Sequence, residues 1–185
     1  PRNPRKWHFE LVTTSESLSL GCMTLQDNPN SELKKVALIA HLVGQTGACI
    51  IYSNGAAEAE NVAHLLFNTI QDNELDQQIV DLIQLVKQTI HPNYALATVL
   101  NKRIAFHYGN MPLLIRNEIE RLFSEGHIKY LVCTSTLLEG VNLPAKSIII
   151  RNPHRGRRNS LNANDFWNLA GRAGRWGKEY KGNII

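Results

Sequence analysis

The sequence predicts an α/β domain with a mainly parallel sheet and helices on both of its faces. Two observations lead to this prediction: short apolar runs alternate with longer segments of helical periodicity, and most of the apolar runs are continuous. A continuous apolar run is typical of a strand that is covered on both faces, as in a parallel sheet. The alternation of strand and helix is typical of the doubly wound plan.

Five segments rich in Ile, Val and aromatic residues are predicted as strands. The first is HFELV near the start of the chain, and the other four are the continuous runs at 48–53, 103–108, 129–134 and 147–151. The closing letters, GNII, are typical of the opening of one more strand.

Four segments are predicted as helices, and they lie at 31–43, 56–67, 74–90 and 112–123. Asn30 or Ser31 suits the N-cap of the first helix. The stretch from Phe67 to Lys102 is long for one crossover between strands, so we expect an inserted helical hairpin on the flank of the domain. We divide the chain into an entry segment over 1–29 and one main domain over 30–185.

Composition favours one intracellular domain. The 185 residues are 43% hydrophobic, which is enough for one substantial core. No apolar run approaches the roughly 20 residues that span a bilayer, and the start of the chain lacks the apolar core of a secretion signal. The three cysteines are far apart, and Cys49 and Cys133 lie in apolar runs, so we expect buried thiols and a cytoplasmic location. The histidines show no metal-ligand spacing, so no zinc site is predicted. Because Pro1 is not an initiator Met, we expect a piece of a longer protein.

The charge is distributed unevenly along the chain. Residues 1–145 carry 11 Lys and Arg against 14 Asp and Glu, whereas residues 146–185 carry 9 against 2. Four arginines fall within 151–158. Such a run is either a solvated loop or a contact for a polyanion such as nucleic acid or nucleotide phosphate.

Two loops that follow predicted strands carry polar groups where α/β sheets bind ligands. In SNGAAEAEN, Ser53 and Asn54 turn the chain into a helix whose free N–H groups suit a phosphate, although any turn between strand and helix needs such residues. In TSTLLEGVNLPAK, Thr134 and Ser135 follow a buried strand and precede Gly140 and Asn142. These groups suit phosphate or sugar oxygens, and the alternative is a structural loop.

A third string, NLAGRAGR, places two arginines near an amide. In a helix, Asn168, Arg172 and Arg175 would share one face, while Leu169 and Ala170 would pack on the sheet. We therefore expect the two guanidinium groups to point together, away from the core, at a target such as a triphosphate. The alternative, a surface arginine pair bonded to carboxylates, has few acidic residues available in this segment.

These three strings, in this order, resemble the motifs of superfamily-two helicases. ACIIYSNGAAEAENVAHLL (48–66) resembles motif IV, TSTLLEGVNLPAK (134–146) motif V and NLAGRAGR (168–175) motif VI. The string from 104 to 146 is most similar to the superkiller-type (Ski-like) branch of the DEAD/DEAH-box helicases. The similarity covers about residues 30–185 and implies a RecA-like three-layer domain, the second of the two in an ATP-driven helicase.

The resemblance implies roles for individual residues. Arg172 and Arg175 match arginines that approach the ATP γ-phosphate, with Arg175 as the arginine finger. Asn168 matches a position near the nucleotide that is usually glutamine, and Gly140 and Asn142 match the nucleotide-facing end of motif V.

The remaining residues are implied to contact nucleic acid. Thr134 and Ser135 match motif V residues near its backbone, and Ser53 and Asn54 lie in motif IV. The basic run adds Arg155, Arg157 and Arg158 as phosphate contacts. The chain departs from the family at Gly55–Ala56, where a Ser/Thr-Arg pair is usual, and at Tyr108, where the branch commonly has a histidine.

No G-x-x-x-x-G-K-[ST] string occurs, and no Asp-Glu pair follows a predicted strand. We therefore expect ATP and Mg²⁺ to be held mainly by the first RecA-like domain of the same chain, with DNA or RNA as the partner and no membrane. Alternatively, the chain is a catalytically inactive, helicase-like scaffold that binds nucleic acid. A nucleotide-binding α/β enzyme of another kind is disfavoured, because the first turn from strand to helix lacks a glycine-rich fingerprint.

Overall fold

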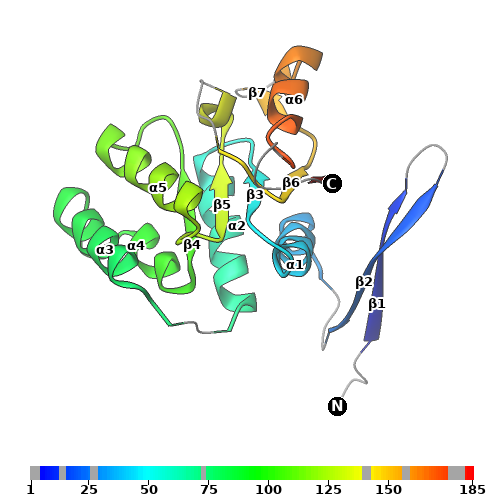
Figure 1. Ribbon diagram of the computed structural model, residues 1–185, viewed down its shortest axis with the longest axis horizontal. Coiled ribbons are helices and arrows are strands. Elements are labelled where there is room, and N and C mark those ends of the chain that lie inside the picture. The colour runs from blue at the N-terminus through cyan, green and yellow to red at the C-terminus, as the bar shows by residue number, and fades with distance from the viewer. Residues whose placement is uncertain are drawn as a thin grey trace.

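The domain is built around a parallel sheet with helices on both faces (Figure 1). The computed structural model of the chain describes residues 5–12, 16–25, 29–71, 74–138, 143–155, 159–174 and 182–185.

The sheet has five parallel strands in the order β4-β5-β3-β6-β9. Their bounds are β3 Cys49–Tyr52, β4 Ile104–His107, β5 Tyr130–Cys133, β6 Ser147–Ile150 and β9 Asn183–Ile184. Every residue of β3, β4 and β5 is buried, which explains why their apolar runs do not alternate. The predicted α/β class and the strand expected in GNII are confirmed.

Four of these strands end level with one another. Tyr52, the last residue of β3, pairs with Cys133 of β5 and with Ile150 of β6. His107, the last residue of β4, also pairs with Cys133. The residues that follow all four strands therefore emerge at one edge of the sheet, which we call the carboxyl edge.

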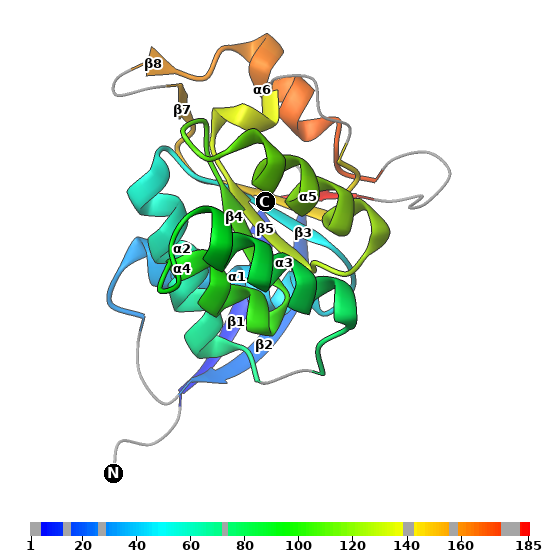
Figure 2. The same ribbon diagram turned by 90° about the vertical axis from the view of Figure 1, so that its left-hand side faces the viewer.

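Helices cover both faces of the sheet. The bounds are α1 Glu32–Gly44, α2 Ala56–Thr69, α3 Gln77–Thr89, α4 Ala95–Val99 and α5 Leu113–Glu125, and a short 3₁₀ turn, η1 Leu100–Lys102, precedes β4. The helices α1 and α2 pack together on one face, and α5 lies on the other (Figure 2). The Ser31 side chain accepts the N–H of Lys34 and so caps α1, and Gly126, at φ +90°, ends α5.

The connection between α2 and β4 holds two helices, as expected for an inserted hairpin. In it, α3 contacts both α4 and α5. The Asp76 side chain caps α3 by accepting the N–H of Ile79, and its other oxygen lies 2.7 Å from Nδ1 of His127, beyond the end of α5. These contacts fix α3 against α5.

The N-terminal strand forms a sheet of its own. HFELV lies in β1 Arg5–Val12, as predicted, but β1 pairs with β2 Ser17–Leu25 in an antiparallel hairpin that stands beside the main sheet (Figure 1). The sequence analysis assigned no strand to 17–25. The division at residue 29 stays a prediction; β2 ends at Leu25 and α1 begins at Glu32.

Three short elements complete the C-terminal part of the domain. A 3₁₀ turn, η2 Ser135–Leu138, follows β5, and a small antiparallel pair, β7 His154–Arg155 and β8 Asn159–Ser160, follows β6. The helix α6 Ala163–Ala170 leads to the segment that bears Arg172.

Replacing Gly44 with Ala should destabilise the chain. A Cβ atom at Gly44 would lie 2.6 Å from Cζ of Tyr130, whose side chain is buried. Overpacking a core costs about 1–3 kcal/mol, which exceeds the gain in helix propensity of at most about 1 kcal/mol. Urea denaturation should therefore show a net loss of about 1–2 kcal/mol. Gly109→Ala is the control, because its Cβ would make only an ordinary 3.7 Å contact with Thr136; equal stability of both variants would contradict the packing account.

Candidate functional site

The carboxyl edge brings together residues from all three strings that the sequence analysis singled out. Ser53 and Asn54 follow β3, and Thr134 and Ser135 follow β5. The helix α6, which leads into the third string, packs against η2 at this edge. The backbone of the following segment, with Arg172, pairs with Ala145 at the amino end of β6, and the Arg172 charge acts on Cys133, the last residue of β5. Parallel strands that end level explain this gathering.

Ser53 and Asn54 have structural contacts at this edge. The N–H of Ser53 donates to the carbonyl oxygen of Cys133 at 2.8 Å, which extends the pairing of β3 with β5 by one residue. The Ser53 side chain is 1% exposed. The Asn54 Oδ1 atom accepts the N–H of His154 at 2.7 Å, and the Tyr52 hydroxyl donates to the His154 carbonyl oxygen at 2.8 Å. The start of β7 is thus anchored to the end of β3.

Motif V begins as a tight turn. Thr134 is buried and Ser135, the first residue of η2, is half-buried. Thr136 is also buried, at 6% exposed, and its hydroxyl faces inward. Gly140 and Asn142 lie outside the described residues.

The basic run lies partly in the β7–β8 pair. Arg155 is the second residue of β7 and pairs with Asn159. Arg157 and Arg158 lie outside the described residues. Arg151 lies 3.9 Å, between Nη2 and Oε1, from Glu58 on α2, so at least one arginine of this run faces a carboxylate.

The prediction that motif VI is one continuous helix is wrong. The helix α6 ends at Ala170, and Gly171 caps it. Asn168 is exposed near its end, whereas Leu169 and Ala170 are buried, as expected. Beyond Ala170 the backbone tightens into turns, because the N–H groups of Arg172 and Ala173 donate only three residues back, to Leu169 and Ala170. The Arg172 carbonyl and the Gly174 N–H then bond to another segment.

That segment lies just before β6 and includes Ala145. The Ala145 N–H donates to the carbonyl oxygen of Arg172 at 3.1 Å, and the Gly174 N–H donates to that of Ala145 at 3.0 Å. Gly174 has φ +69°, in the left-handed region that glycine adopts readily. Motif VI is therefore joined by its backbone to the end of motif V.

We had expected Arg172 to point away from the core. Instead, Arg172 is buried, at only 4% exposed. It lies close enough to Cys133 to oppose the rise in the thiol pKa, which burial brings to about 12. Arg175 lies outside the described residues, so the expectation that the two guanidinium groups share a target stays a prediction.

His107, the last residue of β4, is fully buried. Its Nδ1 atom lies 3.1 Å from the Thr136 hydroxyl, and its Nε2 atom lies 3.5 Å from Oε1 of Glu120 on α5. Burial, with a smaller contribution from the Arg116 charge, lowers the pKa of His107 to about 4. The ring is therefore neutral at physiological pH.

Tyr108 lies on the opposite face from His107, because successive residues of a strand alternate. Its hydroxyl donates to Oε1 of Glu60 on α2 at 2.7 Å and lies 2.7 Å from the hydroxyl of Tyr94. The residue that departs from the family pattern thus has its own partners. Neither Glu60 nor Glu120 was predicted as a site residue; Glu60 lies within the motif IV string, and Glu120 lies four residues after Arg116 on the same face of α5.

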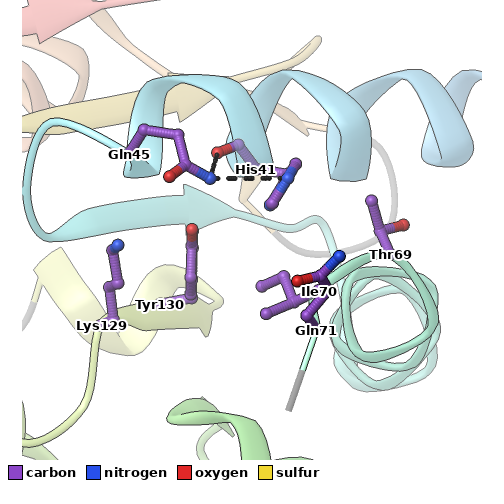
Figure 3. Close-up of a pocket in the computed structure, with 7 residues that line it drawn as sticks. All are labelled: His41, Gln45, Thr69, Ile70, Gln71, Lys129 and Tyr130. Atoms are coloured by element: carbon purple, nitrogen blue, oxygen red, sulfur yellow. Dashed lines mark hydrogen bonds between the residues drawn. The ribbon is translucent and has the colours of Figure 1, made fainter. Parts of the chain in front are cut away.

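A pocket of about 390 Å³ lies at the other end of the sheet (Figure 3). Its walls come from the last turns of α1 and α2 and from the start of β5. The lining residues are His41, Gln45, Thr69, Ile70, Gln71, Lys129 and Tyr130. Because it lies at the amino ends of the strands, it is separate from the carboxyl edge.

Two kinds of feature are absent from the described part of the chain. No group of three or more His, Cys, Asp or Glu side chains there could hold a metal ion. No helix there is long and apolar enough to cross a membrane.

The family model of the helicase conserved C-terminal domain matches residues 64–177. The chain belongs to this family. The match spans motifs V and VI and, with the parallel sheet, confirms the resemblance to the second RecA-like domain of superfamily-two helicases.

Curated relatives of this helicase domain come from bacteria, animals and plants. Anti-bacteriophage protein B of Escherichia coli (strain K12) is 30% identical over 181 residues, which cover 96% of this chain and 24% of that protein. The U5 small nuclear ribonucleoprotein 200 kDa helicase of Drosophila melanogaster is 41% identical over 98 residues, 50% of this chain and 5% of that protein. A DExH-box ATP-dependent RNA helicase of Arabidopsis thaliana is 30% identical over 137 residues, which cover 68% of this chain and 6% of that protein. The chain spans about a quarter or less of the length of these relatives.

The buried neutral His107 predicts a loss of stability in acid. Its pKa in the folded chain, about 4, lies below the ordinary value of 6.5, so the unfolded chain binds a proton first as the pH falls. The stabilisation of the folded chain by the neutral ring is complete above pH 6.5 and is lost between about pH 6.5 and 4. It amounts to about 3 kcal/mol at most. Melting temperatures should fall less over this range in His107→Gln than in the parent chain. His64→Gln, on the exposed side of α2, should keep the parental slope; an unchanged slope in His107→Gln would contradict the assignment.

Proposed function

We propose that this domain is the second motor domain of an ATP-dependent DNA or RNA helicase, and that it supplies an arginine finger and contacts to the nucleic-acid backbone. Family membership supports the helicase role. The observation that carries the finer proposal is the backbone pairing of the Arg172 segment with Ala145, which joins motif VI to the end of motif V.

In this proposal, the nucleotide is shared between two domains. ATP and Mg²⁺ are held mainly by the first RecA-like domain, since this sequence has no phosphate-cradling loop and the described residues offer no group of metal ligands. Mg²⁺ neutralises charge on the β- and γ-phosphates. Arg175 and Arg172 add guanidinium donors from this side of the cleft, and Asn168, Gly140 and Asn142 face the nucleotide.

The Arg172 side chain is buried in this structure, so its contact with a γ-phosphate requires a rearrangement when the two domains close. Arg175 is therefore the finger in this proposal, and Arg172 supports it. Closure on ATP and opening after product release form a hinge-type cycle that moves the protein along the strand.

The nucleic acid lies across the carboxyl edge in this proposal. Thr134, Ser135 and the amide nitrogen of Asn54 contact its backbone, and Ser53 shapes the loop beneath them. Arg155, Arg157 and Arg158 add phosphate contacts. Such contacts are largely independent of sequence, and the affinity they provide falls as salt rises.

Arg175→Ala tests the finger in the intact protein. An arginine finger contributes about 10³-fold or more to the rate of phosphoryl transfer, so nucleic-acid-stimulated ATPase should fall by about that factor. Nucleic-acid binding, measured by fluorescence anisotropy, should stay within about twofold of the parent. Arg121→Ala is the matched control, because Arg121 is an exposed arginine on α5 that pairs with Glu118 and Glu125. Parental turnover in Arg175→Ala would reject the finger assignment.

The shared site also predicts that residues 1–185 alone hydrolyse no ATP above a blank, because the phosphate cradle lies in another domain. Turnover by the purified fragment would contradict the shared site. If the intact protein binds nucleic acid but lacks ATPase, the motor proposal fails and the scaffold alternative remains.

A further inference from the structure

A buried polar cluster connects the turn of motif V to the arginine of motif VI. It contains His107 at the end of β4, Thr136 in η2, Glu120 on α5 and Arg172. The exposed fractions of His107, Thr136 and Arg172 are 0%, 6% and 4%, and the Glu120 side chain is 15% exposed. Buried polar groups cost several kcal/mol unless they have partners, so side chains in such a cluster hold one another in defined positions.

His107 contacts two elements at once. A neutral imidazole has one N–H donor and one acceptor nitrogen. With its acceptor nitrogen at Nδ1, the ring accepts the Thr136 hydroxyl proton over 3.1 Å. Its buried Nε2 atom lies 3.5 Å from Oε1 of Glu120 and makes no hydrogen bond among the described residues. The ring thus links α5 to the turn that carries Thr134 and Ser135.

Glu120 lies close enough to Arg172 for the guanidinium charge to affect its pKa. Burial raises the pKa of Glu120, and the positive charges of Arg116 and Arg172 oppose that rise. The backbone of Arg172 is fixed to Ala145, and η2 contacts α6, so the helix that leads to Arg172 also packs against the motif V turn.

We propose that His107 and Glu120 are positioning residues that fix the motif V turn and Arg172 relative to each other. A phosphate contact at Thr134 or Ser135 is thereby transmitted to the side of the domain that faces the nucleotide. This inference rests on the proposed function and deepens it: both residues lie in the Ski-like string 104–146 but outside the strings of motifs IV, V and VI.

Thr136 allows an isosteric test in the intact protein. Thr136→Val keeps the shape and removes the hydroxyl, whereas Thr136→Ser keeps the hydroxyl. In Thr136→Val, kcat of nucleic-acid-stimulated ATP hydrolysis should fall about tenfold, the factor that corresponds to about 1.4 kcal/mol. KM for ATP and the affinity for nucleic acid should stay within about twofold, because binding of the ground state is not removed. Thr136→Ser should match the parent.

Glu120→Gln tests the other half of the cluster. It should lower the same kcat about tenfold, whereas Glu118→Gln, two residues away and paired with Arg121 on the outer side of α5, should not. The kcat of the double variant Thr136→Val/Glu120→Gln should be no lower than that of the more impaired single variant, since the effects of residues in one network do not add. Melting temperatures confirm that each variant is folded.

Three outcomes would overturn the inference: equal kcat in Thr136→Val and Thr136→Ser, equal kcat in Glu120→Gln and Glu118→Gln, or additive losses in the double variant. Each is judged only against a parent protein whose ATPase responds to nucleic acid. A parent without that response would reject the proposed function itself, and with it this inference.

Discussion

Four parallel strands that are buried on both faces and end level impose the main constraint on this domain. Inside such strands each side chain must be apolar or have a buried partner, so polar chemistry can begin only where the strands stop. Ser53, Thr134 and the neighbours of His107 all lie at that boundary. The hydrogen bonds between Ala145 and the Arg172 segment fix a distant part of the chain to the amino end of β6, and α6, which leads to that segment, packs against η2 at this boundary. Everything proposed for the domain depends on this convergence.

The features that follow from local sequence were predictable. Continuous apolar runs identified β3, β4, β5 and β6, and helical periodicity with Ser31 and Gly126 identified the first and last of the four predicted helices. The β1–β2 hairpin was only half predicted, because 17–25 has few β-branched residues and no turn signature before it. The strands of this hairpin pair with each other rather than with the main sheet, which is a tertiary choice that no local pattern encodes.

The site was predicted in its composition more than in its geometry. The strings at 134–146 and 168–175 pointed to one edge of the sheet. Thr134, Ser135 and Thr136 lie there, whereas Ala145 and the backbone of the Arg172 segment pair at the amino end of β6. The helix expected through Arg172 fails because two glycines weaken it while Ala145 offers alternative backbone partners, a competition that periodicity does not reveal. The partners of His107 were equally hidden, because a histidine in an apolar run carries no sign of what it faces.

The closed pairing of Ala145 with Ala173 has an evolutionary consequence. The chain between them runs through β6 and α6, and this pairing holds its two ends together. A connection with fixed ends can gain or lose residues at an entropic cost that grows only slowly with its length. Changes in length between β6 and α6 would therefore leave the arginine segment where it is, and this connection is the part of the domain in which we expect lineages to differ most in length.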